Sequence, residues 1–138
     1  MPVASAEIDG KVTEYSVGSK RSRPELVQAT ANLHKHMLRQ TDYSPQLVAV
    51  PNYYAKRRPS EGARVWQLVH HAEKKALADL LRHNSTDLSI YLNVSPCDDC
   101  HLFLKCAAKL FQRPIKVRKR DHPLRPVHIF DTHGQCSC

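Results

Sequence analysis

The apolar residues recur with the period of a helix in three segments, residues 24–40, 61–83 and 97–109. Within the first two segments they fall three or four positions apart, so that they line one face, and in the third segment they are expected to be mostly buried. Pro24 suits the first turn of the first helix, and Ser22 is a candidate cap for it. The predicted stripes are Leu26, Thr30, Leu33 and Met37, then Val65, Val69, Ala72, Ala76 and Leu80, then Leu102, Leu104, Cys106, Ala107 and Leu110.

Other segments alternate apolar and polar residues, which is the pattern of a half-buried strand. Gly10 and Gly18 punctuate the ends of the first such segment, and Pro96 ends the second. The order strand, helix, strand, with helices on one face, predicts an α/β sandwich. The predicted strands are residues 11–17, 87–94, 114–118 and 127–130, with a short one at 46–50 inside a proline-rich loop.

Length and composition predict a single domain without a membrane partner. The chain has 138 residues, 41% of them hydrophobic, which is enough for one compact core. No apolar run approaches the roughly 20 residues that span a bilayer. Residues 1–7 also lack the apolar core of a signal peptide. We therefore expect one soluble domain over residues 1–138.

Basic residues outnumber acidic ones and lie in clusters. Lys and Arg total 21 against 13 Asp and Glu, a formal net charge of +8. Such clusters indicate a polyanionic partner, most simply nucleic acid, although a solvated surface explains any single cluster equally well. Two tyrosines could stack on bases or simply belong to the core. The candidate contacts are Lys56, Arg57, Arg58, Arg118, Lys119 and Arg120, with Tyr53 and Tyr54.

A pair of motifs indicates a catalytic zinc site. His71 and Glu73 form the first motif, and Pro96, Cys97 and Cys100 form the second. One histidine and two cysteines would hold zinc and leave a fourth position for water, whereas a structural site takes four protein ligands. Glu73 is not needed as a ligand and suits a proton shuttle. This order of motifs is the general signature of zinc-dependent nucleobase deaminases.

The spacing of these residues constrains the local structure. His71 and Glu73 would point about 200° apart in an unbroken helix. We therefore expect a break at residues 68–70, with a new helix that begins at the metal. Cys97 and Cys100 are three residues apart and face one side of a first helical turn, whose positive end stabilises thiolates. A zinc-bound hydroxide could then attack cytosine or adenine while Glu73 carries the proton to the ring and to the leaving ammonia.

The remaining cysteines and histidines are interpreted by their spacing. An odd cysteine count with tight spacings argues against a disulfide framework and favours metal ligation in a reducing, intracellular setting. Cys106 lies on a mostly apolar helical face and is predicted to belong to the core. His34 and His36 have no nearby residues that complete a ligand set, so we predict that they are surface residues. The five cysteines are Cys97, Cys100, Cys106, Cys136 and Cys138.

A second, structural zinc site is predicted at the end of the chain. His101 follows Cys100 directly, so its side chain points away from the first zinc. With Cys136, Cys138 and one upstream histidine it would complete a closed set of four ligands that attaches the tail to the catalytic helix. His128 is preferred over His133 as that histidine. The alternative is a free tail with two reactive thiols.

Several segments of the chain resemble, in the same order, the DYW domains of plant-type pentatricopeptide-repeat RNA-editing factors. The resemblance is strongest around the two cysteines of the second motif, and it spans nearly the whole chain. These 138 residues contain neither the family's final Asp-Tyr-Trp nor a repeat array. The matching segments are residues 8–15, 22–25, 33–45, 92–101, 114–118, 128–130 and 134–138.

This resemblance implies a cytidine deaminase-like three-layer α/β sandwich, with a central mixed sheet and flanking helices. It implies conversion of cytidine to uridine in single-stranded RNA, and two zinc ions. The catalytic ion would be held by His71, Cys97 and Cys100, with Glu73 as acid and base, and the structural ion by His101, His128, Cys136 and Cys138. The implied parts are a lead-in strand segment (1–23), a helix and gating segment (24–60), a catalytic core (61–120) and a zinc-binding tail (121–138).

The resemblance also implies a pentatricopeptide-repeat array, in cis or in trans, that selects the RNA site. An editing factor of the plant type would act in an organelle. Two alternatives stay open from the residues alone. The substrate could be single-stranded DNA or free cytidine, although the net charge of +8 argues against a free nucleoside. The domain could also be a silent zinc-stabilised RNA-binding module, although the intact Glu73 argues against it.

Overall fold

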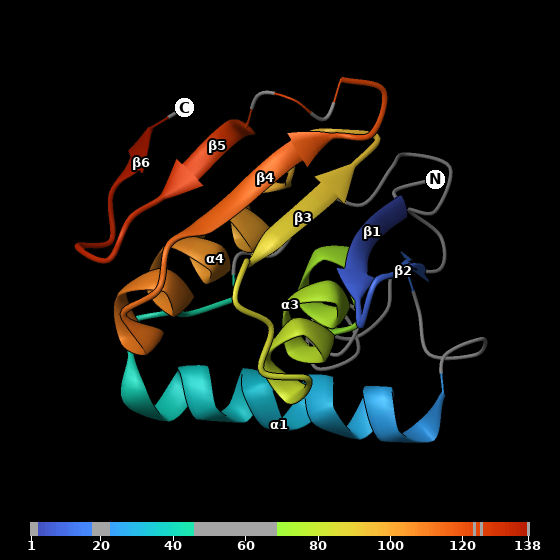
Figure 1. The fold of residues 1–138 in the computed structure, drawn as a ribbon. Coiled ribbons are helices and arrows are strands. Elements are labelled where there is room, and N and C mark those ends of the chain that lie inside the picture. Colours follow the sequence, from blue (N-terminus) through green and yellow to red (C-terminus); the bar gives the residue numbers. More distant parts are fainter. Residues whose placement is uncertain (1–2, 18–22, 46–68, 123, 125, 138) are drawn as a thin grey trace, which may run out of the picture.

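The computed structural model describes residues 3–17, 23–45, 69–122, 124 and 126–137. Figure 1 shows the described helices and strands in chain order. They are β1 (Val3–Ile8), β2 (Lys11–Ser16), α1 (Pro24–Gln40), α3 (Ala72–Arg82), β3 (Ser89–Leu92), α4 (Asp98–Phe111), β4 (Ile115–Lys119), β5 (Pro126–Phe130) and β6 (Cys136–Ser137).

The strands form one six-stranded mixed sheet in the order β2-β1-β3-β4-β5-β6. Only β3 and β4 pair in parallel within the described sheet, and α4 makes the crossover between them, as parallel neighbours require. Alternate strand residues point to the helices and form the core. The expected mixed α/β class is therefore confirmed. The buried apolar and aromatic strand residues of this core are Ala4, Ala6, Ile8, Tyr15, Ile90, Leu92, Ile115, Val117 and Phe130.

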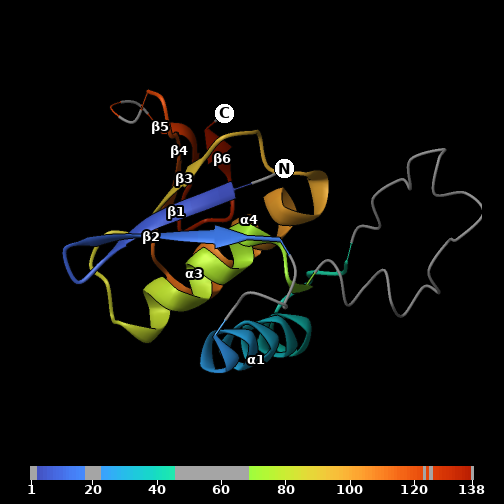
Figure 2. The same cartoon turned by 90° about the vertical axis from the view of Figure 1, so that its right-hand side faces the viewer.

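The described helices lie on one side of the sheet. Helices α3 and α4 lie against the strands, and α1 packs on α3 and α4, farther from the sheet (Figures 1 and 2). This stacking agrees with the helices on one face that the strand–helix–strand order predicts, whereas the resemblance implied three layers with the sheet in the centre. Its physical reason is that the buried face of α1 meets other helices rather than strands. Among the described residues, no helix is long and apolar enough to cross a membrane.

Helix α1 has the predicted bounds, and every residue of its predicted stripe is buried. Its N-cap is Arg23, which makes no side-chain cap hydrogen bond, and the candidate cap Ser22 lies outside the described residues. The predicted break before the catalytic helix is present, because His71 is an extended N-cap residue of α3 with φ −64° and ψ 146°. The predicted strand at 46–50 and residues 61–68 of the second helix lie outside the described residues.

The structure contains two strands that the pattern did not predict. Strand β1 pairs with β2 in a hairpin whose turn residues, Asp9 and Gly10, have φ 52° and 80°. Positive φ at both central residues is the Asp-Gly turn of a tight hairpin, and this dipeptide could have revealed β1. Its buried Ala4 and Ala6 are too small to give a strong apolar signal. Strand β6 has only two residues, which is too short for any periodicity.

The prediction that His34 is a surface residue is wrong. Its side chain is buried at 3% exposure. The imidazole stacks on Phe103 with ring centres 5.9 Å apart and meets Tyr43 edge-on at 5.4 Å. The buried face of α1 is therefore wider than its apolar stripe. Burial lowers the pKa of His34 to about 4. His36 is exposed, as predicted.

This pKa predicts that the fold loses stability in mild acid. The unfolded chain binds a proton at His34 below pH ~6.5, whereas the native state resists protonation until about pH 4. The free energy of unfolding should therefore fall by up to about 1.4 kcal/mol per pH unit over that window because of this group. His34→Gln should remove this slope in urea titrations between pH 6.5 and 4. His36→Gln, at an exposed position, is the matched control, and equal slopes for both variants would contradict the prediction.

Candidate functional site

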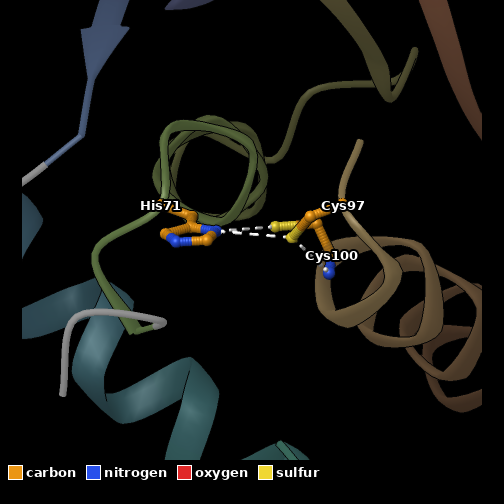
Figure 3. Close-up of side chains that lie close together, drawn as sticks. All are labelled: His71, Cys97 and Cys100. Atoms are coloured by element: carbon orange, nitrogen blue, oxygen red, sulfur yellow. Dashed lines mark hydrogen bonds between the residues drawn. The ribbon is translucent and has the colours of Figure 1, made fainter. Parts of the chain in front are cut away.

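Two helices begin at the candidate site. His71 is the N-cap of α3 and Cys97 is the N-cap of α4, and the backbone of both is extended. Cys100 lies in the first turn of α4 and is fully buried. Figure 3 shows the imidazole of His71 directed at the sulfur atoms of Cys97 and Cys100 from the opposite side. The two half-motifs therefore meet because each occupies a helix start.

The three side chains form a compact donor set. His71 Nδ1 lies 3.3 Å from Cys100 Sγ and 3.6 Å from Cys97 Sγ. All three donor atoms lie within 4.8 Å of one another, so they could hold a metal ion. Zinc bonds of ~2.0–2.3 Å in a tetrahedron place neighbouring donors about 3.5 Å apart. Two sulfurs and an imidazole nitrogen at these separations fit zinc in chemistry and in size.

Glu73 reaches the same cluster from the first turn of α3. Its carboxylate is buried at 4% exposure, and Oε2 accepts a hydrogen bond from Cys100 Sγ at 2.9 Å. A small cavity of about 90 Å³ opens here. Its lining residues are Val17, His71, Glu73, Val94, Ser95 and Cys97. The acid and two of the three candidate metal ligands, His71 and Cys97, therefore line one cavity.

The two thiols of the cluster differ in acidity. The neighbouring Cys100 side chain lowers the pKa of Cys97 to about 4, helped by His71 and by the backbone N–H of Cys100. The pKa of Cys100 is raised well above its usual range, because the thiol faces Cys97 and is buried beside Glu73, which accepts its hydrogen bond. A bound cation that takes both sulfurs as thiolates displaces the proton of Cys100.

A second group of potential ligands lies beside the first. His101, His128 and Cys136 have donor atoms within 4.8 Å of one another, and Cys136 Sγ lies 3.7 Å from His128 Nδ1. His133 instead lines a cleft between α1 and α4, and Cys138 lies outside the described residues. Cys136 is disulfide-bonded in the structure, contrary to the expectation of reduced thiols. This group could hold a metal only after reduction.

The predicted nucleic-acid contacts are only partly described. Arg118 and Lys119 line a groove of about 200 Å³ with Ser95, one residue of the cavity at the metal ligands. Arg120 instead pairs with Glu14 at 2.5 Å. Lys119 is exposed and Arg118 is half-buried. The other candidates, Lys56, Arg57, Arg58, Tyr53 and Tyr54, lie outside the described residues, as does most of the predicted gating segment.

Cys106 is half-buried and packs against the core, although it also lines the cleft between α1 and α4.

A buried ion pair between Lys74 and Asp99 lies beneath the donor set, and the sequence did not predict it. Each of these residues adjoins a motif residue, Glu73 or Cys100. Charged side chains next to a motif are ordinarily expected to face solvent. Only the folded structure shows that Lys74 and Asp99 are both buried.

The family of the chain follows from comparison with known proteins. A family model, the DYW family of nucleic acid deaminases, matches residues 49–138. The chain belongs to this family. The resemblance found in the sequence is thereby confirmed, and the family is one of nucleic acid deaminases. The matched region contains every candidate metal ligand and Glu73.

The relatives of this DYW domain are much longer proteins. The chain is 32% identical to a pentatricopeptide repeat-containing protein of Arabidopsis thaliana, over 96% of this chain and 21% of the relative. Two further Arabidopsis proteins of this kind, one named chloroplastic and one mitochondrial, are each 31% identical over 96% of this chain. They are covered over only 13% and 20% of their length. The chain therefore corresponds to a small part of these relatives.

Proposed function

We propose that this DYW domain converts cytidine to uridine in single-stranded RNA with a catalytic zinc ion. The observation that carries the proposal is the donor set of His71, Cys97 and Cys100 with the Glu73 carboxylate against it. Three protein ligands and one adjacent acid are the composition of a hydrolytic zinc site rather than a closed structural one. The family match supports deamination as the hydrolysis in question.

Zinc held by these three residues would supply Lewis acidity that lowers the pKa of water to near neutrality. Glu73 performs the proton transfers. Its carboxylate accepts one proton from the attacking water and passes it to N3 of cytosine as C4 becomes tetrahedral. It then moves the other proton of that water, now on the C4 hydroxyl, to the amine, which leaves as ammonia while the C4 carbonyl forms. Burial of Glu73 keeps bulk water from competing for these protons.

The charge of the domain supports a polynucleotide substrate. The formal net charge is +8, and the groove of Arg118 and Lys119 adjoins the cavity at the metal ligands. These cations suit the phosphates next to the reacting nucleotide. The reacting base must enter the cavity singly, because C4 is inaccessible in a stacked duplex. We infer that the strand is RNA from the pentatricopeptide repeat-containing relatives, and that such an array, joined in cis, selects the site.

We further propose a structural zinc ion on His101, His128, Cys136 and Cys138. Three of these residues lie together in the structure, and His101 directly follows the ligand Cys100. A metal at this place would join the β5–β6 edge of the sheet to the first turn of α4. For the setting of the reaction we propose an organelle, following the chloroplastic and mitochondrial relatives.

The metal proposal predicts the zinc content of purified, reduced protein. The wild type should carry two zinc ions per chain by elemental analysis. Cys97→Ser and His128→Ala should each remove one, because each variant lacks a ligand of a different site. Cys106→Ser should keep both, since Cys106 lies outside both donor sets. A wild type with one ion, or two ions in His128→Ala, would contradict the second site.

The catalytic proposal predicts RNA editing that depends on Glu73. Total RNA from bacteria that express the chain fused to an RNA-binding repeat array should show cytidine-to-uridine changes near the bound site. Glu73→Ala should reduce them at least about 10²–10⁴-fold, because the proton transfers lose their carboxylate. Glu7→Ala, at an exposed acid on β1, should edit at the wild-type level.

Sequencing the genomic DNA of the same cells separates the alternatives. Changes in DNA alone would assign the domain to single-stranded DNA. RNA binding and full zinc content without changes in either nucleic acid would show a silent binding module and overturn the proposal.

A further inference from the structure

A buried ion pair lies directly behind the candidate metal ligands. Lys74 Nζ lies 2.6 Å from Asp99 Oδ2, and the two side chains are only 1% and 0% exposed. Lys74 follows Glu73 on α3, and Asp99 precedes Cys100 on α4. The pair therefore joins the first turns of the same two helices that carry the donor set.

A third segment meets this pair. The hydroxyl of Tyr43, three residues beyond the end of α1, donates to Asp99 Oδ1 at 2.7 Å and accepts from Lys74 Nζ at 3.0 Å. The ammonium of Lys74 also lies 4.8 Å from the ring centre of Phe103 and 5.3 Å from that of Tyr43. Both charges are thus enclosed by hydrogen bonds and aromatic faces.

Stability alone explains this arrangement poorly. Desolvation of two buried charges costs about as much as their attraction returns, and apolar replacements of a whole buried pair are often neutral or stabilising. Hydrogen bonds to charged groups are, however, short and directional. A pair of this kind fixes the distance and rotation of two helices more narrowly than apolar packing does.

We propose that Lys74 and Asp99 are positioning residues of the metal site. Their ion pair sets the separation of α3 and α4 at their first turns, and hence the separation of His71 and Glu73 from Cys97 and Cys100. Tyr43 ties the segment after α1 to the same pair. The inference rests on the catalytic zinc site proposed above and assigns it a support outside the donor set.

The test replaces the whole pair with apolar residues of similar size, Lys74→Met with Asp99→Leu. The probe is Co²⁺, added alone to the metal-free protein in competition with a chromogenic chelator. We expect 10–100-fold weaker Co²⁺ binding, a changed visible absorption band, and a lower kcat with little change in KM. The melting temperature of the metal-free protein should stay close to that of the wild type.

A second buried contact on the same helix is the matched control. Tyr15 donates to Asp79 Oδ2 at 2.6 Å near the other end of α3, and Asp79 is 0% exposed. Tyr15→Phe with Asp79→Asn should lower the melting temperature but leave Co²⁺ affinity and the absorption band unchanged. A merely structural role for Lys74 and Asp99 predicts that both pairs behave alike.

Asp99→Asn keeps the size of the side chain and one hydrogen-bonding oxygen. This single variant tests the positioning role if the double variant does not fold. It should weaken Co²⁺ binding about tenfold. Wild-type affinity and absorption in either Lys74→Met/Asp99→Leu or Asp99→Asn would overturn the inference. A wild type that binds no Co²⁺ would overturn both this inference and the proposed function. Metal binding that weakens as expected, in a protein without deaminase activity, would refute only the proposed reaction.

Discussion

The first turns of α3 and α4 must lie side by side, and the rest of the fold depends on this constraint. Residues in mid-helix could not bring an imidazole and a carboxylate two positions apart to one place. The structure meets this requirement by making His71 and Cys97 N-cap residues. The parallel β3 and β4 with the α4 crossover hold one helix start, and the β1–β2 hairpin supports the other. The donor set is therefore a product of topology as much as of motif.

Helix α3 shows how strongly this constraint acts on a polar sequence. Every residue from Ala72 to Leu80 is buried, although the helix contains two lysines and two acids in that stretch. Each of the four charged side chains has a different partner. Glu73 accepts from the Cys100 thiol, and Lys74 pairs with Asp99 of α4. Lys75 donates to the Ser16 carbonyl oxygen at 2.7 Å, and Asp79 accepts from Tyr15. These polar contacts hold α3 between the sheet and the other helices. They fix its rotation about its own axis as well as its distance from the sheet.

Motifs and periodicity predicted the parts of the structure that local sequence controls. The bounds of α1, the break before α3 and the start of α4 follow from proline, motif spacing and apolar stripes. The parts that were missed depend on tertiary contacts. His34 is buried because Tyr43 and Phe103 close over it, and Lys74 is buried because Asp99 faces it from another helix. Neither partner can be identified from spacing within one helix.

The two groups of candidate ligands, which meet at the adjacent residues Cys100 and His101, are completed at different times during synthesis. The residues of the first donor set all precede His128 and Cys136 in the chain, so they leave the ribosome earlier. Domains generally fold as units, however, while synthesis adds ~5–20 residues per second. The first donor set therefore waits for the later residues, and both groups of ligands form in the same folding step, when β5 and β6 complete the sheet.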